Sequence, residues 1–73
     1  MKDYHINLFY SEEDKGYIAD IPDLHGCSAF GSTPEKALKE VQIAKKAWMK
    51  TARKIGKSIP TPRYRPAIYQ TAA

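Results

Sequence analysis

The first ten residues alternate between large apolar and polar side chains with a period of two. Tyr4, Ile6, Leu8 and Tyr10 would lie on one face of an extended segment, and the residues between them on the other. Alternation of this kind, with aromatic and β-branched side chains, is typical of a half-buried strand. The pattern therefore predicts a first β-strand over residues 3–10.

Two shorter strands are predicted next, each bounded by turn residues. The polar run 11–16 ends in Gly16, which can adopt a positive φ in a hairpin turn, and residues 17–21 alternate again. Pro22 cannot donate a ladder hydrogen bond, so the second strand is expected to end there. After a short loop, the small side chains of residues 27–31 predict a third strand, antiparallel to the second.

A long amphipathic helix is predicted after the third strand. Thr33 and Pro34 are typical of a helix start, a hydroxyl N-cap followed by proline, and Ser32 is the alternative cap with Glu35 as its capping-box partner. One apolar stripe then recurs every three or four residues until Gly56, where the helix is expected to end. The stripe consists of Ala37, Leu38, Val41, Ala44, Trp48, Ala52 and Ile55.

The order of these elements defines the predicted fold. Three consecutive antiparallel strands followed by a helix indicate an α+β architecture, with the helix on one face of a three-stranded meander. Prolines keep residues 58–62 extended, and residues 63–69 are predicted to add a fourth strand, which Pro66 confines to an edge of the sheet. We expect one domain over residues 1–73, without a separate DNA-binding domain.

The length and the cysteine content limit how this fold can be stabilised. A chain of 73 residues has a small core, and Cys27, its single cysteine, excludes an intramolecular disulfide. No metal or cofactor motif is present, so we expect a homodimer or higher oligomer to supply the missing stability. A lone thiol, no apolar run of about 20 residues and no targeting pattern favour a cytoplasmic location.

Charge is divided unevenly along the chain. Residues 1–35 carry seven acids and two lysines, a net charge of −5, whereas residues 36–73 carry ten bases and one acid, a net charge of +9. This division is typical either of an electrostatic binding face or of a well-solvated, lysine-rich helix.

Three segments carry a family signature. Residues 16–27 read GYIADIPDLHGC, residues 31–38 read GSTPEKAL, and residues 59–62 read IPTP. This order of motifs resembles the HicB-like antitoxin family. The motifs are a strand followed by Pro-Asp-Leu-x-Gly-Cys, a Gly-Ser-Thr helix start, and a Pro-x-Pro segment after the helix. The resemblance covers most of the chain, roughly residues 3–62.

The resemblance implies a partial ribonuclease-H-like fold and a function without enzymatic activity. Members of that family bind and occlude a small HicA-like toxin, a ribonuclease that cleaves mRNA. Full-length members also carry a C-terminal domain that binds operator DNA. Here no second helical module follows residue 62, so we expect an antitoxin-like module of a type II toxin–antitoxin system that blocks a toxin sterically, without autorepression.

The sequence indicates no catalytic or metal site. A two-metal nuclease needs several converging carboxylates, but Asp20 is the one acid inside a predicted strand away from the terminus. His5, His25 and Cys27 are too few for a zinc site. Cys27 beside His25 is better explained as a small buried residue next to a turn histidine than as a nucleophile and its base.

Direct nucleic-acid binding is the main alternative function. Cations gather near the C-terminus of the predicted helix, and two arginines flank a tyrosine in the tail, an arrangement that can contact phosphates and stack on a base. The candidate contacts are Lys46, Lys50, Arg53, Lys54, Lys57, Arg63, Tyr64 and Arg65.

A protein-binding face is predicted on the side of the sheet that the helix leaves uncovered. Two phenylalanines there would anchor a partner, or would pack within a self-dimer. A homo-oligomeric adaptor without a toxin is therefore a third function class. The residues assigned to partner binding or self-association are Phe9, Ile18, Phe30 and His25.

Overall fold

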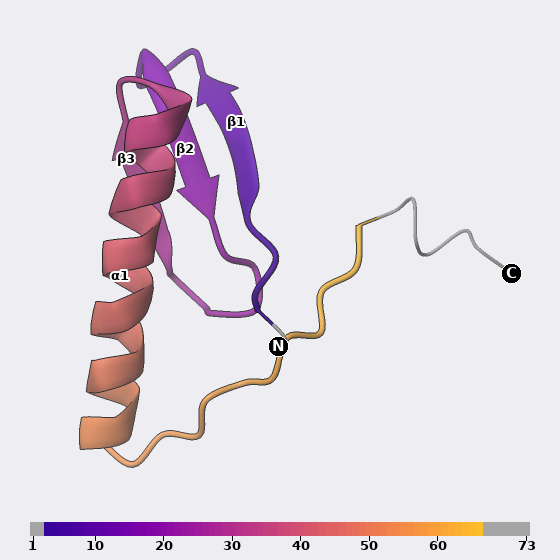
Figure 1. The fold of residues 1–73 in the computed structure, drawn as a ribbon, viewed down its shortest axis with the longest axis vertical. Helices are drawn as coiled ribbons and strands as arrows, with labels where there is room; N and C mark the ends of the chain where they lie inside the picture. Colours follow the sequence, from indigo (N-terminus) through magenta and orange to yellow (C-terminus); the bar gives the residue numbers. More distant parts are fainter. Residues whose placement is uncertain (1–2, 67–73) are drawn as a thin grey trace, which may run out of the picture.

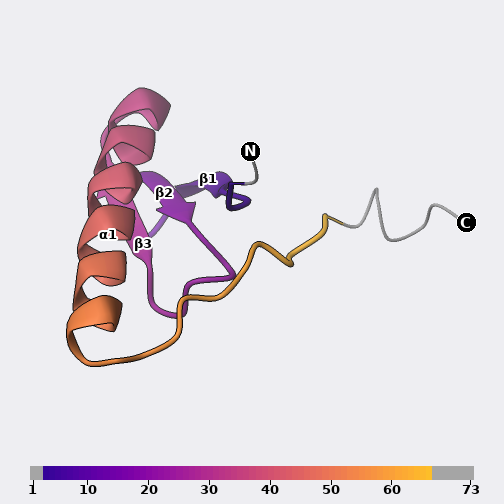
Figure 2. The ribbon, with the colours of Figure 1, turned by 60° about the horizontal axis from the view of Figure 1, so that its bottom comes forward.

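The computed structural model describes residues 3–66 and confirms the α+β architecture. Three antiparallel strands, β1 (Asn7–Ser11), β2 (Gly16–Asp20) and β3 (Ser28–Gly31), precede one helix, α1 (Pro34–Lys54). The strands form a single sheet in the order β1-β2-β3. Figures 1 and 2 show that all three strands lie on the same side of α1, so the helix covers one face of the sheet and leaves the other open.

The strand register determines which side chains share a face. Leu8 pairs with Ala19, and Ala19 pairs with Ala29. Ala19 is fully buried in the core cluster that includes residues of α1, so this row faces the helix. Neighbouring residues of a strand point to opposite faces. The next row, on the face away from α1, consists of Phe9, Ile18 and Phe30.

The core lies between the sheet and α1. Its buried side chains are small or aliphatic, and each is at most 2% exposed. They are Ala19, Ile21, Leu24, Cys27, Ala37 and Val41. Small residues bring helix and sheet close together, since a Cβ placed on Gly31 of β3 would overlap the backbone of Lys36 and Ala37.

The ends of α1 follow the signals in the sequence. Thr33 is the N-cap, and its Oγ1 accepts a hydrogen bond of 3.2 Å from the Lys36 N–H, so Thr33 rather than Ser32 caps the helix. At the other end Gly56 adopts a φ of 76°. The Gly56 N–H donates to the Arg53 carbonyl and the Lys57 N–H to the Ala52 carbonyl, which is a Schellman motif.

Some local predictions are wrong. The first strand begins at Asn7, not at residue 3. The positive φ expected at Gly16 in the turn before β2 is found at Lys15, where φ is 55°. The Lys15 N–H donates to the Ser11 carbonyl, so the turn closes at Lys15, one residue before Gly16. Two members of the predicted apolar helix stripe, Leu38 and Ile55, are 37% and 68% exposed, because they lie at the margin and at the end of the helix–sheet contact.

The fourth strand predicted over residues 63–69 does not form in the part that the structure describes. Residues 63–66 are extended without a strand partner, and residues 67–69 lie outside the described range. The Arg63 and Tyr64 N–H groups donate to the Asp23 carboxylate instead of to a neighbouring strand. Within residues 3–66, α1 is too polar along its length to cross a bilayer.

Candidate functional site

The open face of the sheet carries a row of three apolar side chains, one from each strand. Ile18 of β2 is directly paired with Phe9 on one side and with Phe30 on the other. Phe9 is 51% and Phe30 47% exposed, which is unusual for phenylalanine in a folded domain. We call these three residues the phenylalanine row. Their shared face matches the prediction, and their role in binding stays a prediction.

Polar and acidic residues border the phenylalanine row. The adjacent row on the same face consists of Asn7, Asp20 and Ser28, which are paired in register. Beyond the other end of the strands, the β1–β2 turn holds Glu12, Glu13 and Asp14, all exposed. An apolar centre with a polar rim is the usual anatomy of a protein interface. On these two sides the rim carries four acids against one lysine, Lys15, whereas Lys36 and Lys39 of α1 line a hollow beside Phe30.

Gly16 keeps one end of the phenylalanine row in place. A Cβ on Gly16 would overlap the ring of Phe30, so the ring occupies the space next to the backbone of β2 at this position. The requirement at Gly16 is therefore space for an aromatic ring rather than the positive φ that the sequence suggested.

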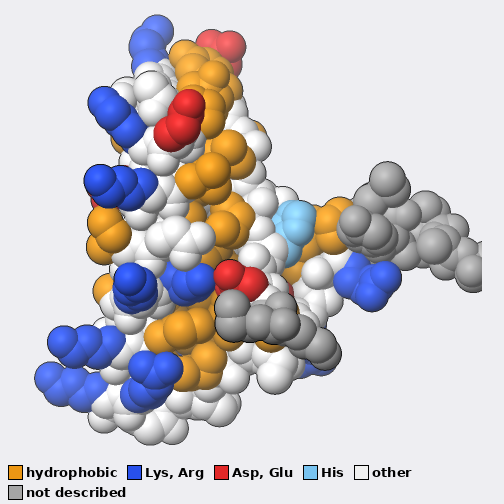
Figure 3. Space-filling model, viewed as in Figure 1, with side chains coloured by type: hydrophobic (Ala, Val, Ile, Leu, Met, Phe, Trp, Pro, Cys, Tyr) orange, Lys and Arg blue, Asp and Glu red, His pale blue; other side chains and the backbone are white. Residues whose placement is uncertain are grey.

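A second apolar surface lies on the helix side of β1, where the sequence pattern predicts burial. Leu8 and Tyr10 are 39% and 50% exposed, although they share the face that α1 packs against. A helix is about 10 Å wide and strands lie about 4.8 Å apart, so one helix centred over β3 and β2 reaches β1 only at its margin. Figure 3 shows the resulting band of hydrophobic side chains beside the helix.

His25, assigned from the sequence to the association face, lies elsewhere. It belongs to the loop between β2 and β3, and its carbonyl accepts a hydrogen bond of 2.9 Å from Nε1 of Trp48 in α1. The loop is thereby tied to the helix, and His25 is not part of the strand ladder that carries the phenylalanine row.

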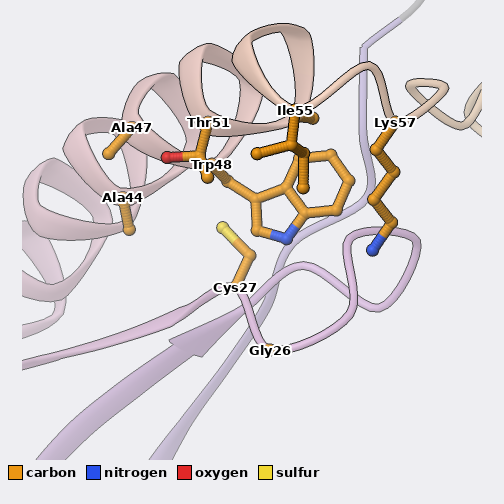
Figure 4. A pocket seen from close by; sticks show the side chains of 9 residues that line it. Gly26, Cys27, Ala44, Ala47, Trp48, Thr51, Ile55 and Lys57 are labelled. Atoms are coloured by element: carbon orange, nitrogen blue, oxygen red, sulfur yellow. The ribbon is translucent and has the colours of Figure 1, made fainter.

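The same loop and the C-terminal half of α1 enclose a groove of about 380 Å³ (Figure 4). The Trp48 ring forms its centre, and the Lys57 ammonium lies 5.3 Å from the ring centroid. The lining is mostly apolar and consists of Gly26, Cys27, Ala44, Ala47, Trp48, Thr51, Ala52, Ile55 and Lys57.

Cys27 at the base of this groove has the properties of a packing residue. Burial raises the pKa of its thiol, and the nearby charge of Asp20 raises it further. The thiol therefore stays protonated at neutral pH and is a poor nucleophile. No group of three or more potential metal ligands occurs within residues 3–66.

The residues proposed to bind nucleic acid fall into separate places. Lys46, Lys50, Arg53 and Lys54 are exposed along α1, whereas Lys57 folds over the Trp48 ring. The segment with Arg63, Tyr64 and Arg65 runs away from the helix (Figures 1 and 2) and is held elsewhere. The structure thus separates the tail from the helix cations.

The extended segment after α1 is attached to the strand side of the domain. The Tyr4 hydroxyl donates to the Pro60 carbonyl, and the His5 and Tyr64 rings are 4.7 Å apart between centroids. The Asp23 carboxylate accepts N–H groups of Arg63 at 2.9 Å and of Tyr64 at 3.0 Å. These backbone hydrogen bonds, that of Tyr64 first, hold the pKa of Asp23 below its ordinary value of 3.8.

This attachment is expected to depend on pH. Because the folded-state pKa of Asp23 is lowered, the attachment is complete above the ordinary pKa and is lost as the pH falls through the lowered value. In NMR spectra, the Arg63 and Tyr64 amide signals should titrate together in that acidic range. We expect Asp23→Ala to increase amide exchange at both positions at neutral pH, and Glu12→Ala, which removes an exposed turn carboxylate, to leave it unchanged. Equal exchange in the two variants would contradict the attachment.

The fold and its site define a class, a small two-layer α+β domain with one face of its sheet open. The chain is 37% identical over 54 residues to the UPF0150 protein ssl0259 of Synechocystis sp., a match that covers 74% of each chain. It therefore belongs to the UPF0150 family. No family model and no solved structure matches the chain.

Proposed function

We propose that the chain is an antitoxin-like protein-binding module that occludes a small, basic, mRNA-cleaving toxin with the open face of its sheet. The single observation that carries this proposal is the phenylalanine row, three paired apolar side chains on a face that no other element covers within residues 3–66. Exposed aromatic side chains at the centre of a polar rim are typical hot spots of protein interfaces.

The acids on two sides of the row favour a basic partner. Asp20 borders the row on one side and the acidic β1–β2 turn lies beyond the other. Acidic residues at the rim would steer a cationic protein to this face and fix its orientation. A ribonuclease that binds mRNA is itself expected to be cationic, so the proposed toxin fits this surface.

The motif resemblance to HicB-like antitoxins supports the same function. The strand, turn and helix-start motifs that carry it, residues 16–27 and 31–38, form β2, the following loop, the end of β3 and the start of α1. Of the phenylalanine row, Ile18 lies within these motifs, while Phe9 and Phe30 lie on the strands to either side of it. The motifs therefore supply the central strand of the proposed surface and the start of the helix behind it.

Self-association through β1 is part of the proposal. β1 is an edge strand with three consecutive exposed apolar residues, Leu8, Phe9 and Tyr10, and without proline or charge. Natural edge strands of this kind are usually covered, because their free backbone groups pair with other chains. A second copy of the chain that pairs with β1 would cover this strand and enlarge the small core.

The test is capture of the tagged domain from its host cytoplasm after nuclease treatment, followed by an mRNA-cleavage assay on the captured protein. We expect to capture a small basic protein that cleaves mRNA on its own. Its cleavage of mRNA should stop when the domain is added in equimolar amount. A captured protein without ribonuclease activity, or one whose activity the domain does not block, would refute the antitoxin function.

Substitutions in the phenylalanine row should weaken that complex by a predictable amount. Phe9→Ala should weaken partner binding by about 2 kcal/mol, roughly thirtyfold, because it removes a central anchor. Lys39→Ala, which removes a charge beside Phe30 but no apolar anchor, should change affinity less than threefold. Titration calorimetry measures both, and equal effects would place the interface elsewhere. Phe30→Ala is expected to act like Phe9→Ala, with an additional loss of stability because its ring also covers Gly16.

A further inference from the structure

The outward side of α1 carries a second charged surface, with the sign opposite to that of the sheet side. Lys46, Lys50, Arg53 and Lys54 follow at helical spacing, which places them along one side of the helix because three to four residues make one turn. All four side chains are exposed, and Figure 3 shows Lys and Arg side chains along this side of α1. We call these four residues the cationic stripe.

No acid neutralises the cationic stripe within residues 3–66. The ion pair found there joins Lys45 to Asp3 at 3.2 Å, and Lys45 points toward the strand side. Glu40 is the last acid in the sequence, more than one helical turn before the stripe begins. Among the described residues, no carboxylate therefore balances the charges of the stripe.

The stripe has a cost for the helix that bears it. Lys46 and Lys50, and Lys50 and Lys54, are like charges four residues apart, and each such pair destabilises a helix by about 0.2–0.5 kcal/mol. The helix dipole favours cations only in the last turn. Solubility alone would be served as well by alternating Lys and Glu. Binding of an external polyanion would offset the repulsion between Lys46 and Lys50, which the helix dipole does not offset.

The charge density of the stripe is comparable to that of a nucleic-acid strand. From Lys46 to Lys54 the helix rises about 12 Å, at 1.5 Å per residue, and carries four cations over that length. The three intervals between the four charges therefore average about 4 Å along the axis. One strand of a duplex carries one phosphate per roughly 3.4 Å of axis.

Two other polyanions fit less well. A membrane-surface helix inserts its apolar face into lipid, but Val41 and Ala52 on that face of α1 are buried in the protein. Single-stranded nucleic acid is bound largely by stacking on aromatic rings. The one aromatic residue of α1, Trp48, faces the groove on the opposite side.

We infer that the cationic stripe binds the phosphate backbone of a duplex nucleic acid without reading its base sequence. The stripe lies on the far side of α1 from the sheet, so this activity is separate from the proposed protein-binding face. A module with both surfaces could hold a basic partner protein and a duplex at the same time.

The test is fluorescence anisotropy of labelled 16-base-pair duplexes, DNA and RNA, titrated with the full chain between 50 and 200 mM salt. With four phosphates neutralised, the logarithm of the binding constant should fall with the logarithm of salt concentration with a slope of about −3 to −4. Lys50→Gln with Arg53→Gln should weaken binding at least tenfold. The matched control, Lys36→Gln with Lys39→Gln, removes the same charge from the start of α1 and should weaken binding less than threefold.

Several results would overturn the inference. They are a slope near zero, equal losses in the two double variants, or competition by polyglutamate as strong as by unlabelled duplex. Circular dichroism should show both double variants folded, since glutamine is as good a helix former as lysine. Phe9→Ala should leave duplex binding unchanged, so a failure of this inference is distinguishable from a failure of the proposed protein-binding function.

Discussion

Replacing Gly31 with alanine should destabilise the domain by about 3 kcal/mol or more, a large share of the about 4–11 kcal/mol expected for a chain of this length. Gly31 ends β3 where α1 begins to cross it, and a Cβ there would overlap the backbone of Lys36 and Ala37. Backbone cannot move aside as a flexible side chain can, so the first turn of α1 would have to lift from the sheet. Thermal unfolding followed by circular dichroism should show a midpoint lowered by more than about 10 °C.

Gly26→Ala is the matched control for Gly31→Ala. Gly26 has a positive φ of 78°, but no atom lies within 4 Å of the place that an added methyl group would take, so only backbone strain opposes the substitution. That strain costs about 1–2 kcal/mol. If Gly26→Ala destabilised the domain as much as Gly31→Ala, close packing of α1 on β3 would not be the reason for glycine at position 31.

Replacing Trp48 with alanine should cost about 3 kcal/mol or more, the second largest effect expected. The indole packs against the core cluster, donates to the His25 carbonyl and supports Lys57. Its loss would leave the groove of Figure 4 without its central side chain and would free the loop between β2 and β3.

Trp48→Phe separates the two roles of this residue. Phenylalanine keeps most of the apolar contact but cannot donate to His25, so we expect a loss of about 1 kcal/mol, the usual net value of one hydrogen bond. Urea denaturation followed by circular dichroism measures both variants. Equal losses for Trp48→Ala and Trp48→Phe would show that the hydrogen bond, rather than the packing, dominates.

The features predictable from the sequence are those that local chemistry determines. Thr33, Pro34 and Gly56 mark the ends of α1 because capping and positive φ depend on neighbouring residues. The period-two pattern separates Phe9, Ile18 and Phe30 from the core-facing residues of their own strands, and the register then aligns the three in one row.

The features that escape prediction depend on contacts between distant residues. The lateral position of α1 over β3 follows from the close approach at Gly31, and it is this position that leaves Leu8 and Tyr10 exposed. The link from Asp23 to Tyr64 spans 41 residues, and that from Trp48 to His25 spans 23. No local pattern marks such pairs, so the sequence predicts a strand for the tail and groups His25 with the phenylalanine row, although His25 lies in the loop before β3.

The order of the elements has a consequence for the newly made chain. All three strands precede α1 in sequence, so during synthesis the meander leaves the ribosome with both of its faces exposed to solvent. A three-stranded meander of this size is marginal until something packs on it, and exposed strand edges invite aggregation and proteolysis. Docking of α1 protects one face only. The lifetime of the free chain in the cell should therefore depend on how soon a partner reaches the other.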